Sequence, residues 1–183
     1  MTTLTKMLKD RIAFDGPISV ADYMAECLMN PKHGYYTQQA VFGRSGDFVT
    51  APEISQMFGE MIGLALGSAW QAQGCPPDAI IVELGPGKGT LMQDLCRISP
   101  TISGFEQLPV HMVESAPKLR SIQAEAIPGV IHHNDVSTLP KKSIFLIANE
   151  FFDALPVRQF CRTAVAWEEF LIGEVAGDLK FGR

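Results

Sequence analysis

Three alternating glycines form the most informative short pattern in the sequence. The apolar run 80–84 leads into Gly85, Gly87 and Gly89, and a helical pattern begins at Thr90. Because glycine has no side chain, such a turn lets the main chain approach a ligand closely, and the N-terminus of the next helix then faces that ligand. The pattern therefore predicts a ligand-binding turn between a strand and a helix.

Two common phosphate-binding loops do not fit this turn. A Walker loop is excluded because Lys88 is followed by Gly89 and no glycine lies five residues before Gly87. The dinucleotide pattern GxGxxG is excluded because its third glycine would fall at Thr90. A glycine turn after a strand is by itself a weak indicator, so the residues around it must decide which ligand it binds.

Three carboxylates lie near this turn in the predicted fold. Glu114 ends the second predicted strand, where it can accept hydrogen bonds from both hydroxyls of a ribose; a solvated acid is the alternative. Asp135 follows the third strand and either accepts from the amino group of an adenine or forms an Asx turn. Glu83 would attract an ammonium or sulfonium group and repel a pyrophosphate, which favours S-adenosylmethionine over NAD.

The elements that must position these residues follow from the hydrophobic pattern after residue 79. Short apolar runs, which predict strands, alternate with helical spacing. The runs are 80–84, 110–113, 130–133 and 144–148. Helical spacing covers 90–98 and 116–126, and Ser115 and Pro117 mark the start of the second helix. This series predicts a parallel sheet, followed over 157–172 by extended chain that turns back on itself.

The first 78 residues are predicted to be mainly helical. One apolar stripe lies within residues 4–12, and a second within 20–28 follows a capping box of Ser19 and Asp22. An Asn-Pro pair ends that second helix, and a loop with a short hairpin is expected after it.

A longer helix is predicted over residues 57–70, after a second capping box formed by Thr50 and Glu53. Glycines repeat every four residues along it, at Gly59, Gly63 and Gly67. Each glycine costs up to ~1 kcal/mol in helix propensity. The repeat predicts a flat side of the helix where another backbone can approach closely.

The composition excludes several functional classes. Lys and Arg total 15 against 20 Asp and Glu, and this formal net charge of -5 argues against nucleic acid as a partner. Apolar residues make up 46% and charged residues 19%, so disorder is excluded. The apolar stretch 57–70 contains Glu60 and is too short to span a membrane. The first residues show no signal or transit pattern, so we expect a cytoplasmic protein.

Neither the cysteines nor the histidines indicate a metal site. The 4 cysteines are scattered without a CxxC pair, which suits reduced thiols. His132 and His133 are adjacent, so on a strand they point to opposite faces and cannot share a metal ion. We therefore expect no metal.

The length of 183 residues suits one domain, but the strand count indicates an incomplete one. A doubly wound sheet normally has about six strands, and four fit between residues 80 and 148. The expected fold class is α/β: a helical region at 1–78, followed at 79–183 by part of a Rossmann-like, doubly wound parallel sheet. Such a truncated chain should expose an apolar patch and should dimerise or aggregate.

Several longer segments together resemble one family. They are ELGPGKGTLMQDL, HMVESAPKLRSIQ, ANEFFDALPVRQF, GDFVTAPEISQMFGE and NPKHGYYT. With these segments the chain resembles, along essentially its whole length, the MidA-like family of S-adenosylmethionine-dependent methyltransferases. Mitochondrial members of that family support assembly of respiratory complex I by methylating a protein arginine. The family's proteins are longer, so the resemblance implies that the C-terminal half, with part of the acceptor site, is missing here.

The resemblance also implies roles for individual residues at the cofactor. Glu83 and the three glycines would form the loop at the methionine end, Glu114 would hold the ribose and Asp135 would lie at the adenine. Residues that would cover the cofactor from the N-terminal side are Gly46, Asp47, Thr50, Pro52 and Glu53. The capping box already explains Glu53, whereas Asp47 lies in a Gly-Asp loop and is the better candidate for ligand contact.

The acceptor side is expected just after the fourth strand, where this fold places Asn149 and Glu150. Methyl transfer is an in-line displacement, so the protein mainly orients donor and acceptor. Carboxylates bind a guanidinium through paired charge-assisted hydrogen bonds, which Glu150 and Asp153 can provide. For Asp153, capping of the next turn is an equal alternative. The catalytic candidates are thus Asn149, Glu150 and Asp153.

Three functions are compatible with the sequence. The first, which we favour, is an S-adenosylmethionine-dependent methyltransferase whose partner is a protein methyl acceptor. The second is a truncated, non-catalytic binding or assembly factor that keeps the nucleoside site, and the third is an NAD-dependent oxidoreductase. A homodimer is compatible with the expected apolar patch.

Overall fold

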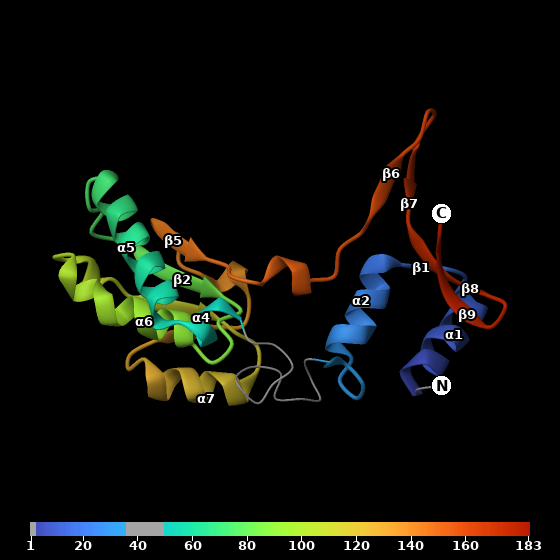
Figure 1. Cartoon of the computed structure of the whole chain (residues 1–183), viewed down its shortest axis with the longest axis horizontal. Helices are drawn as coiled ribbons and strands as arrows, with labels where there is room; N and C mark the ends of the chain where they lie inside the picture. The colour runs from blue at the N-terminus through green and yellow to red at the C-terminus, as the bar shows by residue number, and fades with distance from the viewer. Residues whose placement is uncertain (1–2, 36–49) are drawn as a thin grey trace. The chain divides into compact units, whose positions relative to one another are not determined.

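The chain folds into two compact units. The computed structural model describes residues 3–35 and 50–183. One unit, called here the sheet unit, lies within Phe42–Phe151; the other, the terminal unit, combines Met1–Val41 with Phe152–Arg183 (Figure 1).

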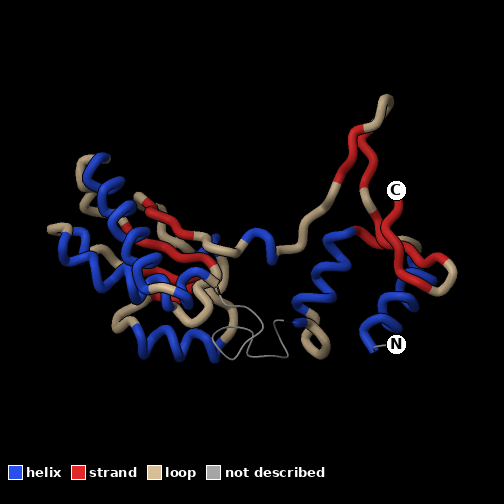
Figure 2. The backbone as a smooth tube through the Cα atoms, in the orientation of Figure 1, coloured by secondary structure: helices blue, strands red, loops and turns tan. Residues whose placement is uncertain are grey.

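Four parallel strands form the centre of the sheet unit. They are β2 (Ile80–Leu84), β3 (Val110–Val113), β4 (Ile131–His133) and β5 (Ile144–Ile147). Their order is β4-β3-β2-β5, and every neighbouring pair is parallel (strands red in Figure 2). The first strand of the series thus lies inside the sheet, and the chain adds strands on both sides of it, as in part of a doubly wound fold. This arrangement confirms the predicted α/β fold class.

The helices of this unit follow the predicted spacing. The α-helices are α4 (Ala51–Ile54), α5 (Gln56–Ala72), α6 (Thr90–Ile98) and α7 (Pro117–Ala126). Short 3₁₀ turns are η1 (Ser99–Thr101), η2 (Phe105–Gln107) and η3 (Val136–Thr138). The predicted helices 57–70, 90–98 and 116–126 therefore agree with α5, α6 and α7 to within two residues at each end.

The glycines of α5 form the predicted flat side, and α6 packs against it. A Cβ atom at Gly59 would lie 2.6 Å from Cβ of Asp94, and one at Gly63 would lie 2.8 Å from Cγ2 of Ile98. Such contacts are closer than carbon atoms tolerate, so no larger residue fits while the two helices stay at this distance. The helix-propensity cost of glycine is therefore offset by a close contact between two helices.

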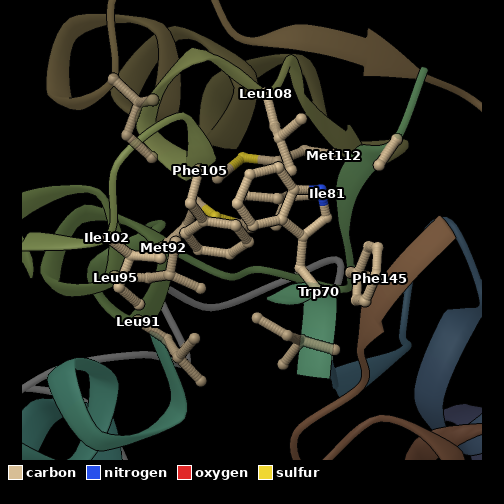
Figure 3. Packing of buried hydrophobic residues seen from close by; sticks show 13 residues of the cluster. Trp70, Ile81, Leu91, Met92, Leu95, Ile102, Phe105, Leu108, Met112 and Phe145 are labelled. Atoms are coloured by element: carbon tan, nitrogen blue, oxygen red, sulfur yellow. The ribbon is translucent and has the colours of Figure 1, made fainter. Parts of the chain in front are cut away.

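One face of the sheet packs on α5 and α6 around a large apolar core. Figure 3 shows Trp70, Leu95 and Phe105 directed into it, and Leu95 and Phe105 are completely buried. The ring centroids of Trp70 and Phe105 are 5.8 Å apart. Because Trp70 comes from α5, the sheet unit includes residues before position 79. The compact units therefore differ from the suggested regions 1–78 and 79–183.

The other face of the sheet is only partly covered. Ile80 and Val82 of the central strand β2 are fully buried there. On the neighbouring strand β5, however, Ile144 and Leu146 on the same face are 41% and 45% exposed. Among the described residues β5 pairs with β2 alone, so its outer side is a free edge. Continuous apolar strands of this kind are normally covered on both faces.

The terminal unit joins both ends of the chain. Its elements are α1 (Thr3–Asp15), β1 (Ile18–Ser19), α2 (Val20–Met29), η4 (Phe152–Ala154), β6 (Phe160–Arg162), β7 (Trp167–Glu169), β8 (Leu171–Val175) and β9 (Asp178–Gly182). The strands β1, β8 and β9 form an antiparallel sheet, in which Ile18 pairs with Ile172, and β6 with β7 forms a hairpin. This hairpin confirms the predicted extended segment that turns back on itself.

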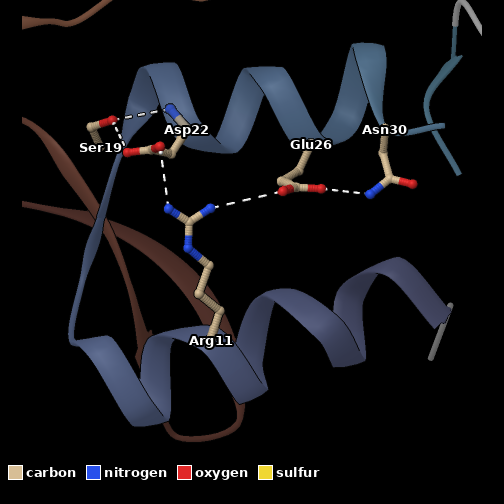
Figure 4. A network of polar contacts seen from close by, with 5 residues as sticks. All are labelled: Arg11, Ser19, Asp22, Glu26 and Asn30. Atoms are coloured by element: carbon tan, nitrogen blue, oxygen red, sulfur yellow. Dashed lines mark hydrogen bonds and ion pairs between the residues drawn. The ribbon is translucent and has the colours of Figure 1, made fainter.

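A polar network connects the two helices of the terminal unit. In Figure 4, Arg11 of α1 lies between Asp22 and Glu26 of α2, at 3.3 Å and 3.8 Å. Asn30 donates to Glu26 over 2.6 Å, and Ser19 accepts from the backbone N–H of Asp22 as the predicted capping box requires. Hydrogen bonding by Ser19, and then by Arg11, lowers the pKa of Asp22. These groups are partly exposed, so the pairs orient the helices more than they stabilise them.

Candidate functional site

The three glycines between β2 and α6 adopt a backbone conformation that other residues avoid. The φ angles of Gly85, Gly87 and Gly89 are 60°, 56° and 83°. The N–H of Gly89 donates to the carbonyl of Pro86 over 2.8 Å, which closes the turn, and Gly89 is the N-cap of α6. The predicted glycine turn is therefore present, with its main chain leading directly into a helix N-terminus.

The aromatic ring of Phe151 covers one side of this turn. A Cβ atom at Gly85 would lie 2.5 Å from Cδ2 of Phe151. Phe151 follows β5, so the segment after β5 reaches back over the end of β2. The sequence pattern did not connect Phe151 to the turn.

Glu83 is a buried carboxyl at the end of β2. It is 3% exposed, and its neighbours on the adjacent strands are Met112 and Ile147. Its Oε2 has no hydrogen-bond partner among the described residues. Burial raises the pKa of Glu83 to about 8, so the group is mainly protonated at neutral pH. A bound cation beside Glu83 would favour loss of that proton. Glu83 would therefore carry its expected negative charge mainly when such a cation is bound.

Glu114 lies after β3 and binds the start of the next helix. Its Oε1 accepts from the N–H of Ala116 over 2.8 Å. Ala116, which has no side-chain oxygen, is the N-cap of α7, so the predicted cap by Ser115 was wrong. Among the described residues, Oε1 is the one oxygen of this carboxylate with a hydrogen bond. The expected hold on both ribose hydroxyls would therefore fall mainly to Oε2.

Asp135 forms the Asx turn that sequence reasoning left as an alternative. Its Oδ1 accepts from the N–H of Ser137 over 2.8 Å at the start of η3, and this bond lowers the pKa of Asp135. The side chain is exposed. Contact with an adenine stays a prediction, because a carboxylate in an Asx turn still has a free lone pair to offer.

Helix α7 holds the glycine turn through a residue that sequence reasoning missed. Gln123 is completely buried, and its Nε2 donates to the carbonyl of Gly87 over 2.7 Å. Its Oε1 accepts from Nε2 of His132 over 2.8 Å, which ties the turn to β4 as well. Burial, and then the charge of Arg120, lowers the pKa of His132. The sequence carried no signal for this contact, because Gln123 is 36 residues from Gly87 and binds its main chain.

The predicted acceptor residues fall on different units. Asn149 and Glu150 follow β5 in the sheet unit, whereas Asp153 lies exposed in η4 of the terminal unit. Glu150 has a φ of 49°, which for a residue other than glycine stores about 1–3 kcal/mol of strain. Asn149 lines a small cavity of about 160 Å³ together with Leu91 and Ile147.

The structure describes only some of the residues that were expected to cover the cofactor from the N-terminal side. Gly46 and Asp47 lie outside the described residues. Thr50 is the N-cap of α4 but makes no side-chain capping bond, so the predicted capping box with Glu53 was wrong. Oε1 of Glu53 instead accepts from Oγ1 of Thr90 over 2.7 Å, at the first residue of α6. This contact places a carboxylate next to the glycine turn.

The candidate site is thus the edge of the sheet where parallel strands end. The turn follows β2, Glu114 follows β3 and Asp135 follows β4, and this edge is where ligands bind in doubly wound folds. Within the described residues, no group of three or more His, Cys, Asp or Glu side chains could hold a metal ion. In the same residues, no helix is long and apolar enough to cross a membrane.

Curated proteins from several animals are similar to the chain in sequence. The chain is 36% identical to "Protein arginine methyltransferase NDUFAF7, mitochondrial" of Danio rerio, over 98% of this chain and 49% of that protein. It is 37% identical to the Homo sapiens protein of the same name, over 99% and 48%. The chain therefore spans about half the length of these relatives. Their mitochondrial location contradicts the expectation of a cytoplasmic protein.

Structure and family comparisons agree with these relatives. A crystal structure from Burkholderia thailandensis, bound to S-adenosyl-homocysteine, superimposes with a TM-score of 0.77 at 28% identity, over 98% of this chain and 49% of that one. A family model described as "Putative S-adenosyl-L-methionine-dependent methyltransferase" matches residues 61–182. The chain therefore belongs to this family of S-adenosylmethionine-dependent methyltransferases.

Proposed function

We propose that this chain provides the cofactor-binding part of an S-adenosylmethionine-dependent protein methyltransferase whose acceptor is an arginine. One observation carries the proposal: three glycines with positive φ connect β2 to α6, and Glu114 directly follows the adjacent strand β3. Family membership and the names of the relatives support it. A nucleoside ligand fits this edge because main chain, and not side chains, would face it there.

The residues present suit the chemical groups of S-adenosylmethionine. When bound, this cofactor supplies an activated methyl group. Glu114 would hold the ribose through Oε2, and Asp135 would lie at the adenine. Glu83, with its unpaired Oε2, would face the positively charged end next to Gly85. Thr50 would cover the ligand from the N-terminal side.

The acceptor chemistry is proposed from the residues after β5. Glu150 is exposed and carries a carboxylate that can pair with a guanidinium through charge-assisted hydrogen bonds. Asn149 would orient the acceptor beside it. The protein's task is then to orient the acceptor and to hold its charge, because the reactive group belongs to the cofactor.

A non-catalytic binding or assembly factor is the second candidate. The free edge of β5 favours it, because among the described residues no strand covers the acceptor side of the sheet there. Methyl-transfer assays with cell lysate as acceptor separate the two functions. Incorporated methyl groups support the enzyme, and their absence in a chain that binds the cofactor supports the binding factor.

Calorimetric titration tests the cofactor directly. We expect S-adenosylmethionine and S-adenosylhomocysteine to bind the chain and NAD to give no heat of binding. Binding of NAD, or no binding of either adenosyl ligand at millimolar concentration, would contradict the proposed function.

A further inference from the structure

One side chain holds together the ends of two neighbouring strands. Arg120 lies on α7, and its Nε donates to the carbonyl of Glu114 over 2.6 Å, with Nη2 donating to the same carbonyl. The same Nη2 lies 2.8 Å from the carbonyl of His133 and 2.6 Å from Oδ1 of Asn134. One guanidinium thus bridges the end of β3 and the end of β4.

These contacts lie where backbone pairing between the strands stops. The last bond between them is from the N–H of Glu114 to the carbonyl of His133, over 3.0 Å. After it, the chain from β3 enters α7 and the chain from β4 enters η3. Beyond this bond, Arg120 is the side chain that links the two segments, in the part of the chain that the structure describes.

The guanidinium of Arg120 binds these oxygen atoms. Among the described residues, no carboxylate forms an ion pair with this guanidinium. A fork of donors that meets backbone carbonyls forms strong, directional hydrogen bonds. The attachment of α7 to the rest of the unit does not depend on them, because Gln123 binds Gly87 separately.

We propose that Arg120 is a positioning residue that sets the spacing between Glu114 and Asp135 for a nucleoside ligand. One of its acceptors belongs to Glu114 itself. The other two belong to His133 and Asn134, the two residues that directly precede Asp135. The inference rests on the proposed function, which assigns the ribose to Glu114 and the adenine to Asp135. Without the guanidinium, Glu114 and Asp135 would both still be present, but the distance between their carboxylates would no longer be fixed.

The first test needs no ligand. Amide hydrogen exchange by NMR compares the wild type, Arg120→Met and Arg120→Lys, with Lys118→Met as the control that removes a charge from the same helix. We expect exchange at Glu114 and Ala116 to quicken on the order of tenfold in Arg120→Met and less in Arg120→Lys. Exchange in the centre of β2 should stay unchanged. Unchanged exchange at Glu114 would overturn the proposal.

The second test separates a positioning role from a general structural one. S-adenosylhomocysteine and its 2′-deoxyribose analogue are titrated into the same variants. We expect the wild type and Lys118→Met to prefer the hydroxylated ligand on the order of tenfold, Arg120→Met to lose that preference and Arg120→Lys to keep part of it. An equal loss for both ligands, with the preference intact, would overturn the proposal. If the wild type binds neither ligand, the proposed function fails, and exchange alone decides whether Arg120 links the strands.

Discussion

The two halves of the parallel sheet, β3 with β4 and β2 with β5, differ in how their strand ends are held. On the side of β3 and β4, the strand ends are tied by Arg120 and the glycine turn is tied by Gln123. On the side of β5, the outer edge has no partner among the described residues, and Leu146 is 45% exposed. Glu150, in the segment after β5, has a strained backbone with a φ of 49°. Both β4 and β5 are thus edge strands in the described part of the chain, but side-chain hydrogen bonds link the strand ends on the cofactor side.

This difference separates binding from transfer. Every contact proposed for the nucleoside lies on β2, β3, β4 or the helices next to them, apart from the covering residues near position 50. The contacts proposed for the acceptor within the sheet unit, Asn149 and Glu150, lie after β5. We therefore expect nucleoside binding to be retained more readily than methyl transfer in this chain.

The largest expected effect is at the glycine turn. Gly85→Ala should lower the free energy of unfolding by about 3 kcal/mol, because it adds unfavourable positive φ to a contact with Phe151. Gly129→Ala is the matched control: its φ is 85°, but a Cβ atom there would meet nothing within 4 Å, so the cost should be about 1 kcal/mol. Urea unfolding measures both. Equal losses would mean that Phe151 does not press on the turn.

The buried carboxyl of Glu83 should give the protein a distinctive pH dependence. Its pKa rises from 4.5 to about 8 on folding, so the folded state binds the extra proton and stability falls as pH rises through this window. Glu83→Gln stays neutral and removes this term. From pH 5.5 to 7.5, the stability of the variant relative to wild type should therefore rise by about 2 kcal/mol.

Urea unfolding at several pH values measures this difference. Comparison with the variant cancels the contribution of other groups, including His111, whose pKa burial lowers. A constant difference across the range would mean that Glu83 is not buried as a neutral acid.

The free edge of β5 should control self-association. We expect the wild type to form dimers or larger species, and Leu146→Lys to weaken that association on the order of tenfold, because a lysine resists burial in an apolar contact. Ile131→Lys on the opposite edge strand is the control, since Ile131 is equally exposed at 45%. Light scattering over a concentration series distinguishes them. Equal effects of both substitutions, or a clean wild-type monomer, would remove the special role of β5.

The smallest effect concerns strain on the acceptor side. Glu150→Gly should raise the free energy of unfolding by about 1 kcal/mol, because glycine accepts the φ of 49° that glutamate does not. Asn149→Gly, at the preceding position without positive φ, should lower it instead. Thermal unfolding compares the two variants. Destabilisation by both would show that Glu150 gains nothing from relief of its backbone.

Local patterns in the sequence were sufficient for the elements and the turn. The four parallel strands, the long helices and the glycine turn each depend on residues within a short window, and each was predicted. The antiparallel strands β1, β8 and β9, which pair the two ends of the chain, were not. The close approach of α5 and α6 also followed from a local repeat, because Gly59 and Gly63 leave no side chain between the helices.

Contacts between distant residues could not be predicted in this way. The Thr50 capping box failed because Glu53 binds Thr90, which is 37 residues away. Gln123 was missed because its partner, the carbonyl of Gly87, is 36 residues away and any residue type presents a carbonyl. Arg120 was missed because its acceptors include backbone carbonyls, which the residue types do not reveal. A resemblance to a family names conserved segments but does not show which side chain in them binds main chain.

Affinity for S-adenosylhomocysteine in wild type and Glu114→Ala tests the central claim most directly. The claim is that the glycine turn and Glu114 together form a nucleoside site. Removal of the carboxylate should weaken binding by about 10-fold to 150-fold, because it removes charge-assisted hydrogen bonds to the ribose. Circular dichroism shows whether the variant keeps its fold. Equal affinity of a folded Glu114→Ala variant and the wild type would contradict the assigned site.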